Sequence, residues 1–194
     1  MTAIVGLIDN GSVYIGGDSC GIAGLSKSIR IDPKVFSNGP FIIGGTSSFR
    51  MLQLLRFKFA PPPQTNLQDD YEYMVTHFID TARQCFASNG FGDEKAQIGG
   101  TFMVGYRGHL YTVEGDYQVG IPAASFDAVG CGSDLCLGSL YATEGLDPED
   151  RINCALAAAS TFSAGVAPPF TILKLEGEHK KPKAKKRAKK ASKK

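Results

Sequence analysis

The chain opens with Met1 followed by TAIVGLIDNGSVYIGGDS, residues 2–19, and this stretch has the pattern of a β-hairpin. Two apolar, β-prone runs at residues 3–8 and 13–17 flank the pair Asn10-Gly11. Asn-Gly is a strong hairpin signal, because both residues tolerate the positive φ angles of a tight turn. A hairpin brings its two ends together, so Asp18 is expected to lie back beside Thr2.

The same reading along the rest of the chain predicts short strands and paired helices. Apart from the hairpin, strands are expected at 34–36, 41–44, 100–106, 109–114, 125–130 and 170–175. Helices are expected at 47–59, 69–88, 133–143 and 148–163, with Thr46 or Ser47 capping the first of them. Hairpin-linked strands that alternate with helix pairs indicate an α+β fold of antiparallel sheets with helices on their outer faces, not a βαβ crossover fold.

Length and composition place the chain among globular proteins with one folded domain. Its 194 residues fit a single domain, and it is 43% hydrophobic and 21% charged. No apolar run approaches the roughly 18 residues that a transmembrane helix needs. We therefore expect a folded body over residues 1–178 and a separate Lys-rich segment over residues 179–194.

The Lys-rich segment concentrates positive charge at the end of the chain. Residues 180–194 hold ten Lys or Arg and no acid, which leaves a body with a net charge of about −8. With no large apolar residue, this tail is expected to be disordered in isolation. It is a candidate for electrostatic binding of nucleic acid or an acidic surface through Lys185, Lys186, Arg187, Lys189 and Lys190. A solubilising tail, or one held against the acidic body, is the alternative.

Metal and cofactor chemistry finds no support in the sequence. The three His residues are isolated, and no HExxH, CxxC or phosphate-binding glycine loop is present. Five cysteines form neither a disulfide framework nor a zinc pattern, and the N-terminus lacks the basic region of a secretory signal. We expect no metal and no cofactor, and a cytoplasmic location in which most thiols stay reduced.

Thr2 is the candidate nucleophile. A small second residue favours removal of Met1, which would leave a threonine with a free α-amino group. Such an amine has an ordinary pKa of roughly 7.7–8.0, so it can act as a general base near neutral pH. A threonine hydroxyl activated by its own amine is an established way to obtain a nucleophile.

The spacing that follows Thr2 gives this candidate its weight. Sixteen residues separate Thr2 from Asp18, sixteen more separate Asp18 from Lys34, and the pair Gly44-Gly45 ends a strand before a helix. In this joint pattern the chain resembles the proteasome β-subunit and HslV peptidase family of the N-terminal nucleophile hydrolase superfamily. The resemblance covers nearly all of residues 2–175. It implies a four-layer αββα sandwich of two antiparallel sheets flanked by helices.

The resemblance also implies a role for each residue of the pattern. Thr2 Oγ would attack the scissile carbonyl, and the Thr2 amine would accept the proton. Lys34 would sit beside Thr2 as an ammonium that favours the alkoxide and lowers the proton affinity of the amine, and Asp18 would hold Lys34. The Gly45 amide would donate to the developing oxyanion.

Two departures from the family pattern concern the supporting residues. Gly130-Cys131-Gly132 matches a segment in which the family usually has a serine in place of Cys131. Ser160 occupies the position of an aspartate that follows the fourth helix in many proteasome β subunits, whereas Ser163 is retained. Cys131 and Ser163 are therefore expected as supporting residues. A cysteine nucleophile at Cys131 is disfavoured, because no His partner can be identified.

The resemblance finally implies a threonine endopeptidase in a self-compartmentalising, homo-oligomeric ring, with polypeptide substrates and an AAA+ ATPase unfoldase as partner. Two alternatives stay open. One is a catalytically silent or non-proteolytic ring of the same fold, which a retained Met1 would produce directly. The other is a nucleic-acid-associated protein that acts through its basic tail.

Overall fold

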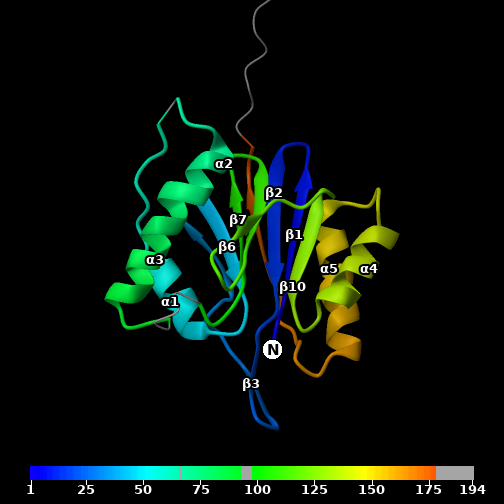
Figure 1. Ribbon diagram of the computed structural model, residues 1–194. Helices are drawn as coiled ribbons and strands as arrows, with labels where there is room; N and C mark the ends of the chain where they lie inside the picture. Colours follow the sequence, from blue (N-terminus) through cyan, green and yellow to red (C-terminus); the bar gives the residue numbers. More distant parts are fainter. Residues whose placement is uncertain (66, 93–97, 178–194) are drawn as a thin grey trace, which may run out of the picture.

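The computed structural model describes residues 1–65, 67–92 and 98–177, which form a four-layer sandwich (Figure 1). Two antiparallel sheets lie face to face in the centre, and helices cover the outer face of each. This arrangement is the αββα architecture expected from the sequence.

The first sheet has the strand order β10-β1-β2-β11. Its strands are β1 (Ala3–Asp9), β2 (Ser12–Gly17), β10 (Phe126–Gly130) and β11 (Thr171–Leu175). The hairpin between β1 and β2 has the expected turn, with φ of 47° at Asn10 and 77° at Gly11. In its register Ile4 lies opposite Gly17, which places Asp18 beside the start of β1.

The second sheet has the order β5-β6-β7-β8-β9. Its strands are β5 (Val35–Asn38), β6 (Phe41–Gly45), β7 (Phe102–Tyr106), β8 (His109–Val113) and β9 (Val119–Gly120). The two sheets enclose an aliphatic core that includes Ile4, Ile15 and Val35. They approach closely at Gly44, where a Cβ would lie 2.9 Å from side-chain atoms of Ile4 and Ile15.

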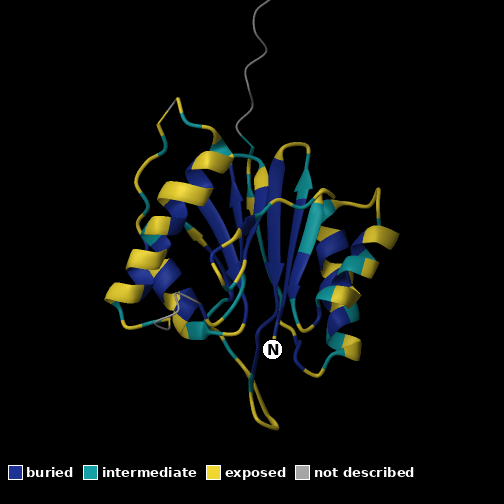
Figure 2. Ribbon diagram, viewed as in Figure 1, coloured by how far each residue is buried: buried dark blue, intermediate teal, exposed yellow. Residues whose placement is uncertain are grey.

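Each sheet packs against its own pair of helical segments (Figure 1). The second sheet is covered by α1 (Phe49–Phe57) and by a continuous helix of α2 (Asp70–Tyr73), the π-helical turn η1 (Met74–Phe78) and α3 (Ile79–Ser88). The first sheet is covered by α4 (Ser133–Ala142) and α5 (Pro148–Phe162). Figure 2 shows the buried faces of these helices turned towards the sheets and their exposed faces turned outwards. In the described ranges, no helix has the length and apolarity that crossing a membrane requires.

The structure also contains strands that the sequence did not predict. Residues 20–32 were expected to contain no element, but β3 (Cys20–Ala23) and β4 (Ser26–Ile29) pair as a hairpin, and β9 is also new. This hairpin projects from the end of the sandwich at which the N-terminus lies (Figure 1). Every residue of β4 is exposed, so the strand lacks the apolar alternation by which a half-buried strand is recognised.

The start of α1 needs a smaller correction. Its N-cap is Ser48, whose hydroxyl accepts a hydrogen bond from the Met51 amide at 3.2 Å. Thr46 and Ser47, the two expected caps, belong instead to the turn that leaves β6. The helix therefore begins two residues later than expected, and this turn becomes part of the site described next.

Candidate active site

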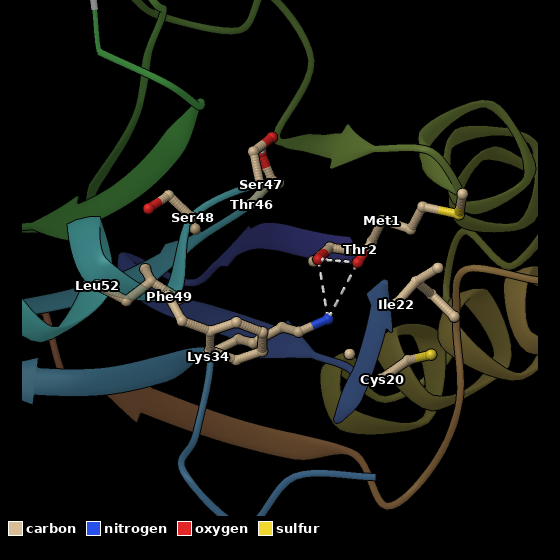
Figure 3. A pocket seen from close by; sticks show the side chains of 12 residues that line it. Met1, Thr2, Cys20, Ile22, Lys34, Thr46, Ser47, Ser48, Phe49 and Leu52 are labelled. Atoms are coloured by element: carbon tan, nitrogen blue, oxygen red, sulfur yellow. Dashed lines mark hydrogen bonds between the residues drawn. The ribbon is translucent and has the colours of Figure 1, made fainter. Parts of the chain in front are cut away.

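Thr2, Lys34 and Asp18 form a buried chain of contacts at one end of the sandwich, and Figure 3 shows Thr2 and Lys34. Thr2 immediately precedes β1, Asp18 follows β2, and Lys34 precedes β5. The Lys34 ammonium donates to Thr2 Oγ1 at 2.8 Å and to Asp18 Oδ1 at 2.8 Å. The side chains of Lys34 and Asp18 are only 2% and 0% exposed, so their ion pair is shielded from water. The three residues that were singled out by their spacing in the sequence therefore lie in contact in the structure.

Backbone amides fix the Asp18 carboxylate from three directions. Its Oδ1 accepts from the Ala3 amide at 3.1 Å, and its Oδ2 accepts from the amides of Cys20 at 2.8 Å and Ala167 at 3.2 Å. These bonds fix the orientation of the carboxylate, so Asp18 holds the Lys34 ammonium against the Thr2 hydroxyl.

Met1 lies across this arrangement. The Thr2 hydroxyl donates to the Met1 carbonyl, and the Lys34 ammonium also approaches that carbonyl, at 3.4 Å. The Met1 side chain packs beside Gly165, where a Cβ would lie 2.4 Å from Met1 Cβ. With Met1 in place the Thr2 nitrogen is an amide and cannot serve as a base.

Cys131, just after β10, contacts the Thr2 nitrogen, and Ser163, at the end of α5, contacts Cys131. The Thr2 N–H donates to Cys131 Sγ at 3.3 Å, and Cys131 Sγ lies 3.5 Å from Ser163 Oγ. Both supporting residues are thus in the positions expected of them. A thiol is a weak hydrogen-bond partner, so this contact holds the nitrogen less firmly than a hydroxyl would.

The five cysteines are expected to differ sharply in reactivity. Cys131 and Cys154 are exposed, whereas Cys20, Cys85 and Cys136 are buried. Burial raises the pKa of Cys136 to about 12 and also raises the pKa of Cys85, which disfavours the reactive thiolate. In the native protein at pH 8 we expect two thiols to react rapidly with an aromatic disulfide reagent, and five after denaturation. Rapid reaction of three or more native thiols would contradict this burial pattern.

Modification of Cys131 should also block access to Thr2, because its sulfur is in contact with the Thr2 nitrogen. The matched variants are Cys131→Ser and Cys154→Ser. Only the first should protect the protein from loss of Thr2 reactivity after thiol treatment. Equal loss in both variants would mean that Cys131 does not adjoin the reactive group.

The Gly45 amide does not fit its expected role. Gly45 is the last residue of β6, and its N–H donates to the Lys34 carbonyl at 3.1 Å, within the sheet rather than into the site. The amides on either side of Ser47 are also engaged, since Thr46 N–H donates to Thr101 and Ser48 N–H donates to Thr46. Within the described part of the chain, the Ser47 amide has no hydrogen-bond acceptor. Ser47, not Gly45, therefore offers a free donor here.

Ser47 could not have been identified from the sequence. Its φ of 67° lies in the left-handed region, which a serine rarely adopts and a glycine adopts freely. The only available signal was a run of polar residues between a strand and a helix. This turn makes Ser47 one of the residues that line the pocket containing Thr2.

A pocket of about 70 Å³ opens beside Thr2 and Lys34 (Figure 3). Its remaining wall mixes apolar and hydroxyl-bearing side chains and comes from β3, from the turn after β6 and from α1. The residues that line it are Met1, Thr2, Cys20, Gly21, Ile22, Lys34, Gly45, Thr46, Ser47, Ser48, Phe49 and Leu52. A buried hydroxyl, an ammonium and a free amide at the wall of one pocket can carry out acyl transfer. The basic residues Lys185, Lys186, Arg187, Lys189 and Lys190, which the sequence proposed for nucleic-acid binding, lie outside the described residues.

Comparison with solved structures identifies the fold. BPH from Thiobacillus denitrificans in complex with epoxomicin superposes with a TM-score of 0.75 over 90% of this chain and 98% of that one, at 18% identity. Eukaryotic HslV from Trypanosoma brucei superposes with a TM-score of 0.66 over 90% of this chain and 99% of that one, at 17% identity. No protein-family model matches the sequence, and no curated protein matches it significantly.

These matches confirm the fold expected from the resemblance to HslV-type proteins. The match covers 98% and 99% of the two solved chains. Identities of 17–18% support the shared fold alone. The chemistry of this chain has to be argued from its own residues.

Proposed function

We propose that this chain is a threonine endopeptidase that becomes active once Met1 has been removed. One observation carries the proposal: the Thr2 hydroxyl, buried at a pocket, accepts a 2.8 Å hydrogen bond from a lysine that is itself paired with a buried carboxylate. An ion pair with a purely structural role does not require a threonine hydroxyl beside its ammonium group. A nucleophile does need such a partner, because a nearby cation stabilises the developing alkoxide.

The first chemical step is attack by Thr2 Oγ1 on the carbonyl carbon of the scissile peptide bond. A C–O bond forms, the carbonyl π electrons move to oxygen, and the hydroxyl proton passes to the free Thr2 amine. Lys34 stays protonated throughout and stabilises the oxygen that loses its proton. Asp18 takes no proton and serves to orient Lys34.

The resulting oxyanion needs donors that are already in place. We assign this role to the Ser47 amide, because it borders the same pocket and has no acceptor among the described residues. Collapse of the intermediate breaks the C–N bond, and the protonated Thr2 amine returns its proton to the leaving amine. Water then attacks the acyl-enzyme ester by the same route and releases the acid.

Removal of Met1 is therefore the activating event. The Thr2 nitrogen would change from an amide to an amine while keeping its place beside Cys131. The lost Met1 carbonyl would free the Thr2 hydroxyl and one contact of Lys34. A chain that retains Met1 corresponds to the catalytically silent alternative.

Mass spectrometry of the purified protein combined with epoxomicin, the compound bound in the BPH structure, tests the proposal. We expect an intact mass without the initiator methionine and a covalent adduct that maps to Thr2. In a crystal structure of that adduct, the former carbonyl oxygen should lie against the Ser47 amide. A chain that lacks Met1 but gives no adduct and hydrolyses no peptide would overturn the proposal.

We further propose that copies of the chain assemble into a ring that encloses the sites. Large apolar side chains stay exposed on three helices, with Phe57, Tyr141 and Phe162 exposed by 69%, 76% and 77%. Burying such residues against another copy would be favourable. Native mass spectrometry on the same sample reports the assembly, and a monomer at micromolar concentration would contradict the ring. An ATPase partner that controls entry stays a prediction.

A further inference from the structure

Two pockets share one wall at the start of α1. The first is the 70 Å³ pocket beside Thr2. The second, of about 140 Å³, lies between α1 and the segment before β5 and is lined by Asp32, Pro33, Gln53, Arg56 and Phe57. Phe49 and Leu52 line both pockets, so they form the partition between them. Leu52 is buried in the helix packing, whereas Phe49 is only partly buried and forms the part of the wall that can change.

Phe49 is held in this position by an arginine clamp. The guanidinium carbon of Arg30 lies 3.9 Å from the centroid of the Phe49 ring. Two hydrogen bonds, at 2.8 and 2.6 Å, in turn tie Arg30 to the Asp32 carboxylate in a bidentate pair. The hydrogen bond from Arg30 lowers the pKa of Asp32, so the pair stays charged on both sides through neutral pH. The contact of the Arg30 guanidinium with the Phe49 ring and the bidentate pairing of Arg30 with Asp32 together restrict how far the Phe49 ring can turn.

The size of the first pocket limits what it can accept. A cavity of about 150 Å³ lined by apolar side chains binds benzene. With Met1 as part of its lining, the pocket beside Thr2 has less than half this volume. On the side closed by Phe49 it leaves room for a small aliphatic side chain and not for an aromatic one. Together the two pockets would exceed the benzene-sized cavity, and Phe49 is what separates them.

The charge of the pocket wall is a second constraint on the substrate, besides the volume of the pocket. Apart from Lys34, which Asp18 neutralises, the wall beyond the nucleophile carries no charged side chain. It combines the apolar side chains of Met1, Cys20, Ile22, Phe49 and Leu52 with Gly21, Gly45, Thr46, Ser47 and Ser48. The Arg30 charge behind Phe49 is neutralised by Asp32. Met1 also lines the pocket, but it lies on the other side of Thr2 from Phe49 in Figure 3. Its removal therefore widens the pocket on that side and leaves the Phe49 wall in place.

We propose that the pocket beside Thr2 selects substrates with a small aliphatic residue, such as Ala or Val, at the carbonyl that Thr2 attacks, and that Phe49 sets this limit. The proposal rests on the proposed peptidase function, because it names the substrate class of that same site. Phe49 is a specificity-determining residue, and Arg30 and Asp32 are positioning residues that act through it.

The test uses the full-length protein and peptides that differ only at this residue, with Ala, Val, Leu or Phe in front of a fluorogenic amine. For the wild type, kcat/KM should be at least about 10-fold higher with Ala or Val than with Phe, as expected for misfit in an apolar pocket. In Phe49→Ala, the ratio of kcat/KM for the Phe peptide to that for the Ala peptide should rise at least about 10-fold. Asp32→Asn, which weakens the clamp, should raise the same ratio by a smaller factor.

Gln53→Ala is the matched control. Gln53 lies on the same helix and lines the second pocket but not the first, so this change should leave the ratio unaltered. Phe49→Leu is a milder second variant in case the alanine variant does not fold, and it should raise the ratio by an intermediate factor.

The outcomes separate this proposal from the function on which it rests. Hydrolysis by the wild type with an equal or higher kcat/KM for the Phe peptide overturns the size limit alone. So does an unchanged ratio in the folded Phe49 variants. Failure of the wild type without Met1 to cleave any peptide overturns the peptidase function and the size limit together.

Discussion

Replacing Thr2 by Ala is expected to lower kcat for peptide hydrolysis by at least about 10³-fold, to background level. The change removes the attacking oxygen and leaves the amine, Lys34 and Asp18 in place. Lys34 loses one hydrogen bond but keeps its ion pair with Asp18, so the free energy of unfolding should fall by only about 1–3 kcal/mol. Steady-state kinetics and denaturant unfolding on the same preparation measure both effects.

Thr2→Ser is the matched control, because serine keeps a hydroxyl and an amine on one residue. Both Ala and Ser are small, so Met1 should be removed from both variants and the comparison isolates the oxygen. The Ser variant should retain measurable hydrolysis and the Ala variant none above background. Full activity in a purified Thr2→Ala protein would rule out the mechanism.

Replacing Lys34 by Ala is expected to damage both activity and stability. The charge that stabilises the Thr2 alkoxide is lost, so kcat/KM should fall almost as far as in Thr2→Ala. The substitution also leaves the Asp18 carboxylate, whose side chain is 0% exposed, without its cation. Removing one partner of a buried ion pair typically costs about 3–5 kcal/mol, which denaturant unfolding would detect.

A double replacement separates the catalytic role of Lys34 from its structural role. Lys34→Met combined with Asp18→Asn removes both charges, so it should recover much of the lost stability but none of the activity. Lys34→Arg should also be poorly active, since a planar guanidinium does not fit where a compact ammonium reaches Thr2 and Asp18. Recovery of activity together with stability in the double variant would show that Lys34 acts only through the fold.

The comparison of sequence and structure is most instructive at the site itself. The proximity of Asp18 to Thr2 could be predicted, because a tight hairpin alone returns Asp18 to the start of the chain. Lys34, and Gly45 as the oxyanion donor, were implied by the resemblance to the HslV-type family, and of these two only Lys34 contacts Thr2. In the structure the Gly45 amide pairs with Lys34, and the free donor is two residues later, on a serine with a positive φ.

The sequence by itself determined the order of the elements, the apolar faces that stack the two sheets, and the return of Asp18 to Thr2. These features depend on local turns and on regular alternation, which can be recognised along a single chain. The tertiary structure decided the exposed β3–β4 hairpin, the free amide of Ser47, the contact of Cys131 with Thr2 and the partition at Phe49. Each of these depends on how segments far apart in the chain pack together, as with Thr2 and Cys131, which are 129 residues apart. No local pattern encodes such a distance, because only the closed sandwich fixes it.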